Sequence, residues 1–146
     1  MKDKISIIAG GSGQFGVYLS QFLIKKGYKT IITTRNINIA KKKIPFKNKN
    51  LFLTKLNVLN KKEIKKLIFK YDPKLIFYFA SQSSPKVSFK KEKITFSSNY
   101  DGCKNFLEVI QNERVDCKFI NATSSEIFSE TKKRINLKSK KNPISP

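Results

Sequence analysis

A glycine-rich turn near the N-terminus constrains the fold of this chain more than any other feature. Gly10, Gly13 and Gly16 stand between a short apolar run, Lys4–Ala9, and a segment with helical periodicity, Phe15–Lys26. Between a strand and a helix, this spacing is typical of dinucleotide-binding turns, because glycine allows a tight turn, close approach of a pyrophosphate and close helix packing. The free N–H groups that begin the helix favour phosphate. The turn therefore predicts dinucleotide contacts at Gly10, Gly13, Gln14, Phe15 and Gly16.

Strand and helix patterns alternate along the rest of the chain. Short runs typical of buried strands recur at Thr30–Thr34, Leu51–Thr54, Lys74–Ala80 and Cys117–Thr123. Helical spacing of apolar residues, or a helix-capping residue, marks segments between them, at Asn36–Lys43, Asn60–Tyr71 and Ser97–Asn112, whereas Ser81–Lys93 is expected to be a loop. Right-handed crossovers between such strands predict an α/β class, a doubly wound parallel sheet (the Rossmann fold), whose ligand lies beyond the carboxyl ends of the strands.

The basic charge of the chain does not by itself indicate nucleic acid. The net charge is +21, with 31 Lys and Arg against 10 Asp and Glu, yet the only arginines are Arg35, Arg114 and Arg134. Nucleic-acid-binding surfaces favour Arg, whose planar fork matches phosphates and base edges. The lysines are scattered from Lys25 to Lys141 among many Ile and Asn residues, the residues of A/T-rich codons. We therefore expect no nucleic-acid partner, although a basic RNA- or DNA-associated protein on the same scaffold stays an alternative.

The composition also excludes several classes of protein. The 39% hydrophobic and 28% charged residues are typical of a soluble globular domain, and no apolar run approaches the ~20 residues of a membrane-spanning helix. The absence of histidine excludes a Ser-His-Asp triad, a Cys-His pair and a His-ligated zinc, and we expect no metal. Two cysteines, Cys103 and Cys117, form no disulfide framework, so a reducing cytoplasm is the expected location.

The residues after the second predicted strand indicate which dinucleotide binds. A site for NAD usually places Asp or Glu there, where the carboxylate binds the ribose hydroxyls. Here the strand runs into Thr33-Thr34-Arg35-Asn36, with no acidic side chain in reach. A guanidinium at this position suits the 2′-phosphate of NADP. Arg35 therefore favours NADP over NAD.

Three further strand ends carry a resemblance to a known family. They read Asn57-Val58, Phe79-Ala80-Ser81-Gln82-Ser83 and Ala122–Phe128 (ATSSEIF), and Asn99 and Gly102 stand in the helix before the last of them. With the glycine turn, these segments resemble the extended short-chain dehydrogenase/reductases, and among them the GDP-mannose 4,6-dehydratases. The resemblance runs from Ile5 to Pro146, which is less than half the length of such an enzyme.

The resemblance implies NADP as the cofactor and assigns its contacts. The Arg-Arg pair of the family stands here as Arg35-Asn36, and the Asp-Leu pair that recognises adenine stands as Asn57-Val58, which keeps a hydrogen-bonding side chain but drops the charge. The Leu-Ala-Ala-Gln-Ser segment of the family corresponds to Phe79, Ala80, Ser81, Gln82 and Ser83.

The last strand end carries the implied catalytic residues. The Ser-Thr-Ser-Glu-Leu-Tyr-Gly segment of the family is matched by Thr123–Ser129, with Ser124 as the hydroxyl and Glu126 as the glutamate. Epimerase relatives generally lack this glutamate, so Glu126 favours elimination over plain epimerisation. Decarboxylating relatives share it, and Gln82-Ser83 favours the dehydratase.

The implied reaction needs one more pair of residues. NADP takes a hydride from C4 of the hexose, a glutamate removes the acidified C5 proton, water leaves from C6, and the hydride returns to C6. Oxidation at C4 needs a tyrosine whose pKa is lowered by a nearby lysine, in a Tyr-x-x-x-Lys pair. In the family this pair closely follows a Ser-Pro. No tyrosine follows the fifth predicted strand, and the sequence stops at Ser145-Pro146.

These points define the expected organisation and function. We expect residues 1–130 to form an NADP-binding Rossmann domain, incomplete at its C-terminal side, and residues 131–146 to be a Lys-rich loop leading to a missing catalytic helix. The chain is then the cofactor-binding part of a GDP-mannose 4,6-dehydratase, inactive alone, whose full-length relatives act on GDP-mannose as homo-oligomers. The alternatives are another NAD(P)-dependent sugar-nucleotide epimerase, dehydratase or decarboxylase, and a non-catalytic NADP-binding module.

Overall fold

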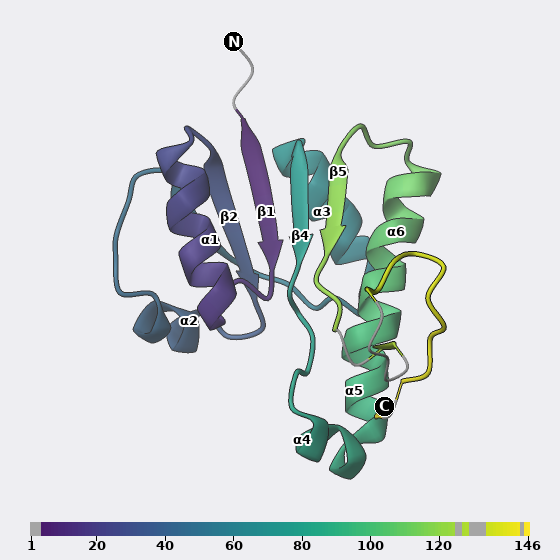
Figure 1. Ribbon diagram of the computed structural model, residues 1–146. Helices are drawn as coiled ribbons and strands as arrows, with labels where there is room; N and C mark the ends of the chain where they lie inside the picture. The colour runs from purple at the N-terminus through teal and green to yellow at the C-terminus, as the bar shows by residue number, and fades with distance from the viewer. Residues whose placement is uncertain (1–3, 125–126, 129–133, 144) are drawn as a thin grey trace.

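A five-stranded parallel sheet forms the centre of the molecule (Figure 1). The computed structural model describes residues 4–124, 127–128, 134–143 and 145–146. The strand order is β3-β2-β1-β4-β5, formed by β1 (Ile5–Ala9), β2 (Lys29–Thr34), β3 (Leu51–Lys55), β4 (Leu75–Tyr78) and β5 (Lys118–Asn121). Because the chain crosses from one side of β1 to the other between β3 and β4, the sheet is doubly wound, as predicted, and its switch point lies between β1 and β4.

The helices occupy the connections between these strands. They are α1 (Gln14–Lys25), α2 (Ile37–Lys43), α3 (Lys61–Tyr71), α4 (Pro85–Lys90), α5 (Glu92–Phe96), the π-helix η1 (Ser97–Asp101) and α6 (Gly102–Asn112). Asn60 caps α3 as predicted, since its side-chain oxygen accepts hydrogen bonds from the N–H groups of Lys62 and Glu63 at 3.0 and 3.3 Å. Gly27 follows the end of α1 with a φ of +81°, the left-handed conformation that commonly ends a helix.

The prediction of a loop at Ser81–Lys93 is correct for residues 81–84 and wrong for most of the rest of the segment. Helix α4 lies inside this segment and α5 begins at Glu92. Pro85 stands in the first turn of α4, where its missing N–H costs nothing. Ser88 is buried, and its hydroxyl donates to the Pro85 carbonyl at 2.6 Å. A short helix that buries a serine shows no apolar periodicity, so the sequence pattern did not reveal it.

The central strand β1 is buried on both faces. Ile7 and Ala9 belong to the larger core, together with residues of α3 and α6. Ile8 points the other way, into the smaller core that contains Val17 and Leu23 of α1. Each fully buried Ile contributes roughly 2 kcal/mol to folding. This two-sided burial explains why the first strand reads as a continuous apolar run rather than an alternating one.

Helix α1 covers one face of the sheet at β1 and β2. At β4 and β5, no helix of the described part of the chain covers that face (Figure 1). Ile76 and Tyr78 are fully buried on the α3 and α6 side, whereas Leu75 and Phe77 on the opposite face are only half-buried. On β5, Ile120 is 37% exposed. Figure 1 shows no helix in front of these two strands. Within the described residues the fold is therefore incomplete at its C-terminal side, as the sequence indicated.

The chain after β5 has little regular structure in its described parts. Phe128 and Lys141 form an isolated antiparallel bridge, and the Asn142 N–H donates to the Ile127 carbonyl at 2.9 Å. Asn136 and Ser139 close a turn, in which the Asn136 N–H donates to the Ser139 hydroxyl at 2.9 Å. No helix among the described residues is long and apolar enough to cross a membrane.

A buried tyrosine joins the sheet to the π-helix. The Tyr78 side chain is fully buried, and its hydroxyl donates a hydrogen bond to the carbonyl of Ser98 in η1. Burial raises the pKa of the Tyr78 phenol, so the group stays protonated and remains a donor at neutral pH. Gly102 at the start of α6 lies against the same side chain, and a Cβ there would meet the Tyr78 hydroxyl and, at 2.8 Å, a methyl of Val58.

We predict that Tyr78→Phe destabilises the chain by about 1–2 kcal/mol, because the Ser98 carbonyl loses its donor. Tyr18→Phe is the matched control, since Tyr18 is 63% exposed on α1. Chemical denaturation of both variants measures the effect. Equal stability of the two variants would show that the hydrogen bond does not stabilise the junction.

Candidate functional site

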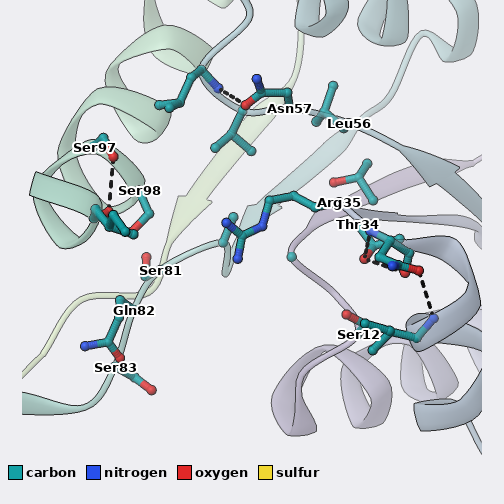
Figure 2. A pocket seen from close by; sticks show the side chains of 18 of the residues that line it. Ser12, Thr34, Arg35, Leu56, Asn57, Ser81, Gln82, Ser83, Ser97 and Ser98 are labelled. Atoms are coloured by element: carbon teal, nitrogen blue, oxygen red, sulfur yellow. Dashed lines mark hydrogen bonds between the residues drawn. The ribbon is translucent and has the colours of Figure 1, made fainter. Parts of the chain in front are cut away.

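A cavity of about 510 Å³ opens at the carboxyl ends of the strands (Figure 2). This volume lies within the range of small-molecule sites. The turns after β1, β2, β3 and β4 line it, together with α2 and the α5–η1 helix. Its lining residues are Gly10, Ser12, Thr33, Thr34, Arg35, Asn36, Ile39, Lys43, Leu56, Asn57, Val58, Leu59, Ala80, Ser81, Gln82, Ser83, Ile94, Ser97 and Ser98. The position agrees with the prediction that a ligand binds beyond the strand ends at the switch point.

Gly10 makes the close approach between the first turn and the end of β4. Its φ is +74°, and a Cβ there would lie 2.5 Å from the Cα of Ala80. Its N–H donates to the Thr33 carbonyl at 3.1 Å, which ties the turn to β2 as well. Gly16 is equally confined, because a Cβ there would clash with the backbone of Gly11. The glycine spacing thus has the steric reasons that the sequence suggested.

Arg35 extends from the end of β2 into the cavity, toward the side formed by Ser81 (Figure 2). Thr34 and Asn36, on either side of Arg35, stabilise the turn after β2 by hydrogen bonds. The Asn36 N–H donates to the Thr34 hydroxyl at 3.2 Å, and the Asn36 side-chain oxygen accepts the Ile39 N–H at 3.1 Å as the N-cap of α2. Local capping therefore fixes the backbone from which the guanidinium projects.

Asn57 organises the turn after β3. Its side-chain oxygen accepts the Leu59 N–H at 3.1 Å, and its own N–H donates to the Glu63 carboxylate at 2.9 Å. Val58 lines the cavity beside it and packs against the larger core. The side-chain oxygen of Asn57 thus serves the turn, while the apolar Val58 and Leu59 supply cavity surface.

The segment after β4 is clamped by the π-helix. The Gln82 N–H donates to the side-chain oxygen of Asn99 at 2.8 Å, and the Asn99 amide donates back to the Gln82 carbonyl at 3.0 Å. The Gln82 side chain closes a turn with Ser84 through two bonds of 2.6 Å. Gln82 therefore lines the cavity with a side chain that already holds the loop, and Asn99 is a positioning residue for the wall formed by Ala80, Ser81 and Ser83.

The structure brings together only part of the predicted site. Eight predicted residues line the cavity, namely Gly10, Arg35, Asn57, Val58, Ala80, Ser81, Gln82 and Ser83. Gly13, Gln14, Phe15 and Gly16 stand at the start of α1 beside it, and Phe15 is 79% exposed. The half-buried Phe79 packs against the smaller core instead. Ser124 is exposed and does not line the cavity, and Glu126 lies outside the described residues.

One tyrosine does have a lysine four residues later, a spacing that the sequence-based prediction passed over. The Lys104 ammonium lies 5.8 Å from the centre of the Tyr100 ring. Tyr100 is 52% exposed and stacks on Phe96, with 4.9 Å between ring centres, while Lys104 lies 3.8 Å from Glu108. Both precede β5 and neither lines the cavity. This pair therefore belongs to the helix surface.

Several cavity residues were not predicted from the sequence. Ser12 lies inside the glycine-rich turn but was not singled out there, and Ser97 and Ser98 lie on η1 outside any motif. The others include Ile39, Lys43, Leu56, Leu59 and Ile94. Ile39 and Lys43 are four residues apart on α2, the spacing that places two side chains on one helix face. This spacing is the sequence feature that could have indicated which face of α2 lines the cavity.

The cavity is positively charged. Arg35 and Lys43 are charged, and no Asp or Glu stands among the lining residues. Glu63 lies behind the turn after β3, where its carboxylate accepts hydrogen bonds from Asn57 and Asn60. Within residues 4–124 and the described parts of the tail, no three His, Cys, Asp or Glu side chains gather in a group that could hold a metal ion. The site suits an anionic organic ligand.

Comparison with known proteins agrees with this reading of the fold and then gives the family. The structure of UDP-glucose 4-epimerase from Brucella ovis, in complex with NAD, matches 97% of this chain and 42% of that one with a TM-score of 0.82 and 16% identity. The chain thus has the Rossmann-like fold of such epimerases. Residues 7–146 match the family model described as GDP-mannose 4,6 dehydratase, so the chain belongs to the GDP-mannose 4,6-dehydratase family.

Curated relatives match the chain over most of its length. A GDP-mannose 4,6 dehydratase of Drosophila melanogaster is 28% identical over 140 residues, which cover 88% of this chain and 35% of that protein. GDP-mannose 4,6 dehydratase 2 of Arabidopsis thaliana is 30% identical over 141 residues, 88% of this chain and 38% of that protein. The chain therefore spans little more than a third of the length of these relatives.

We predict that Gly10→Ala destabilises the chain by more than 2 kcal/mol, because a Cβ adds a backbone clash to the cost of a positive φ. Gly27→Ala is the matched control, since Gly27 has a φ of +81° with nothing within 4 Å of the added Cβ. The control should cost about 1 kcal/mol. Chemical denaturation compares the two, and equal losses would mean that the contact with Ala80 does not constrain the turn.

Proposed function

We propose that the cavity binds NADP and that the chain is the cofactor-binding part of a GDP-mannose 4,6-dehydratase. The observation that carries this proposal is Arg35, which enters a cavity whose lining residues include no acid. A carboxylate at the end of β2 would bind the ribose hydroxyls of NAD and repel a 2′-phosphate, whereas a guanidinium attracts the phosphate.

The cavity suits each part of this cofactor. Gly10 leaves room for the pyrophosphate at the switch point, because a Cβ would fill the space against Ala80. Val58 and Leu59 offer apolar surface for adenine beside Arg35. Ser81 and Ser83, held by the Asn99 clamp on Gln82, offer polar groups further along the same cavity. When bound, the cofactor supplies hydride exchange with the sugar.

The dehydratase activity of the whole enzyme follows from the family. We propose GDP-mannose as its substrate, with Ser124 orienting the sugar and Glu126 removing the C5 proton. Residues 1–130 would be the NADP-binding domain and residues 131–146 a connection toward the catalytic tyrosine. We further propose that the whole enzyme is a homo-oligomer and that it is cytoplasmic; the free thiols of Cys103 and Cys117 support the second point.

We predict that the chain binds NADP more tightly than NAD and that Arg35→Ala removes most of the preference. Loss of charge-assisted hydrogen bonds to the 2′-phosphate should weaken NADP binding about 10- to 100-fold and NAD binding by less than about threefold. Titration calorimetry with both dinucleotides measures this. The control is Arg114→Ala, because Arg114 follows α6 and does not line the cavity. Equal affinity of the unaltered chain for the two dinucleotides would contradict the proposal.

We predict that the 146 residues alone do not convert GDP-mannose to the 4-keto-6-deoxy product. No tyrosine follows β5, so the C4 hydroxyl has no base, and loss of such a group typically costs about 10²–10⁴-fold. Fusion in frame to the C-terminal part of a relative should restore turnover, and Glu126→Gln in that fusion should abolish water loss. Product analysis by chromatography tests both. Turnover by the chain alone would overturn this assignment of roles.

A further inference from the structure

Helix α2 carries a second cation on the wall of the cavity. Lys41, Lys42 and Lys43 form the last turn of this helix. Of the three, Lys43 lines the cavity, together with Ile39 four residues earlier on the same face. All three are exposed, but Lys41 and Lys42 do not line the cavity. One basic side chain of this run is therefore placed differently from its neighbours.

The residue after Arg35 does not supply a second positive charge to the cavity. Asn36 is neutral, and its side-chain oxygen accepts the Ile39 N–H at 3.1 Å as the N-cap of α2. This cap orients the helix whose far end carries Lys43. A 2′-phosphate is close to a dianion at neutral pH, and a single guanidinium leaves part of its charge unpaired.

Lys43 is available for such an anion. It forms no ion pair with an acidic side chain of the residues that the structure describes. The cavity lining near it contains no carboxylate, and Thr34, Arg35 and Ser12 surround the same space. The position thus combines an unpaired ammonium, a guanidinium and hydroxyl groups, which together match the chemistry of a phosphate monoester.

We infer that Lys43 is a specificity-determining residue that binds the 2′-phosphate of the dinucleotide jointly with Arg35. This inference rests on the proposed NADP function of the cavity. Lys43 replaces, from the end of α2, the second positive charge that the neutral Asn36 does not provide. Ile39 on the same face positions α2 against the ligand, so the phosphate lies between the end of β2 and the last turn of the helix.

The test compares two neighbouring lysines in the full 146-residue chain. Lys43→Ala should weaken binding of NADP, and of adenosine 2′,5′-bisphosphate, about three- to tenfold, while binding of NAD and AMP changes less than twofold. Lys42→Ala removes the same charge from the same helix turn and should leave all four affinities within twofold. Lys43→Arg should restore most of the NADP affinity. Titration calorimetry gives the affinities, and thermal denaturation checks that the variants fold.

Two results separate this inference from the function on which it rests. If NADP binds in preference to NAD and Lys43→Ala behaves like Lys42→Ala, Lys43 does not contact the phosphate and the inference is wrong while the function stands. If the unaltered chain shows no preference for NADP, the proposed function itself fails. An equal loss of NADP and NAD affinity in Lys43→Ala would assign the lysine to the common part of the ligand, which also overturns the inference.

Discussion

The pairing of β1 with a parallel strand on each side governs the rest of the structure. Ile7 and Ile8 are both fully buried although they point to opposite faces, so β1 needs helices on both sides of the sheet. Parallel neighbours also bring the carboxyl ends of β2 and β4 beside the end of β1. A side chain at Gly10 would meet the backbone of Ala80 at that point. The residue that follows β1 is therefore a glycine, which lets the first turn lie against the end of β4 in the wall of the cavity.

Patterns of local origin were predictable from the sequence. The central strands β1 and β2 read as buried β-branched runs because they are buried on both faces. The cap at Asn60 and the stop at Gly27 follow from hydrogen bonding and φ alone. A helix was predicted over Ser97–Asn112, but the π-helical character of its first residues was not predictable. It depends on tertiary hydrogen bonds, from Tyr78 to the Ser98 carbonyl and between Asn99 and Gln82, whose partners are 17 or 20 residues apart in the chain.

The site was predictable where backbone geometry defines it, at Gly10 and Arg35, and less so where folding decides which side chains face the cavity. Gln82 was expected to contact the ligand, yet its side-chain amide holds Ser84 in a turn. Phe79 was expected there as well, but successive residues of a strand point to opposite faces, and Phe79 packs into the smaller core. Lys43 was not singled out because it is one of three consecutive lysines, and only their positions around helix α2 determine which of them faces the cavity.

The cavity is positively charged because no carboxylate of the described residues lines it, and not because the whole chain has an excess of lysine. Most lysines of the chain are exposed, where water and salt screen them. Arg35 and Lys43 are exposed as well, but they share one concave space with no carboxylate among its lining residues. Low-dielectric walls such as Leu56, Val58 and Ile94 focus the field of these two cations. On the proposed function, selection of a phosphate is a property of this geometry, and the net charge of +21 contributes mainly to nonspecific attraction of anions.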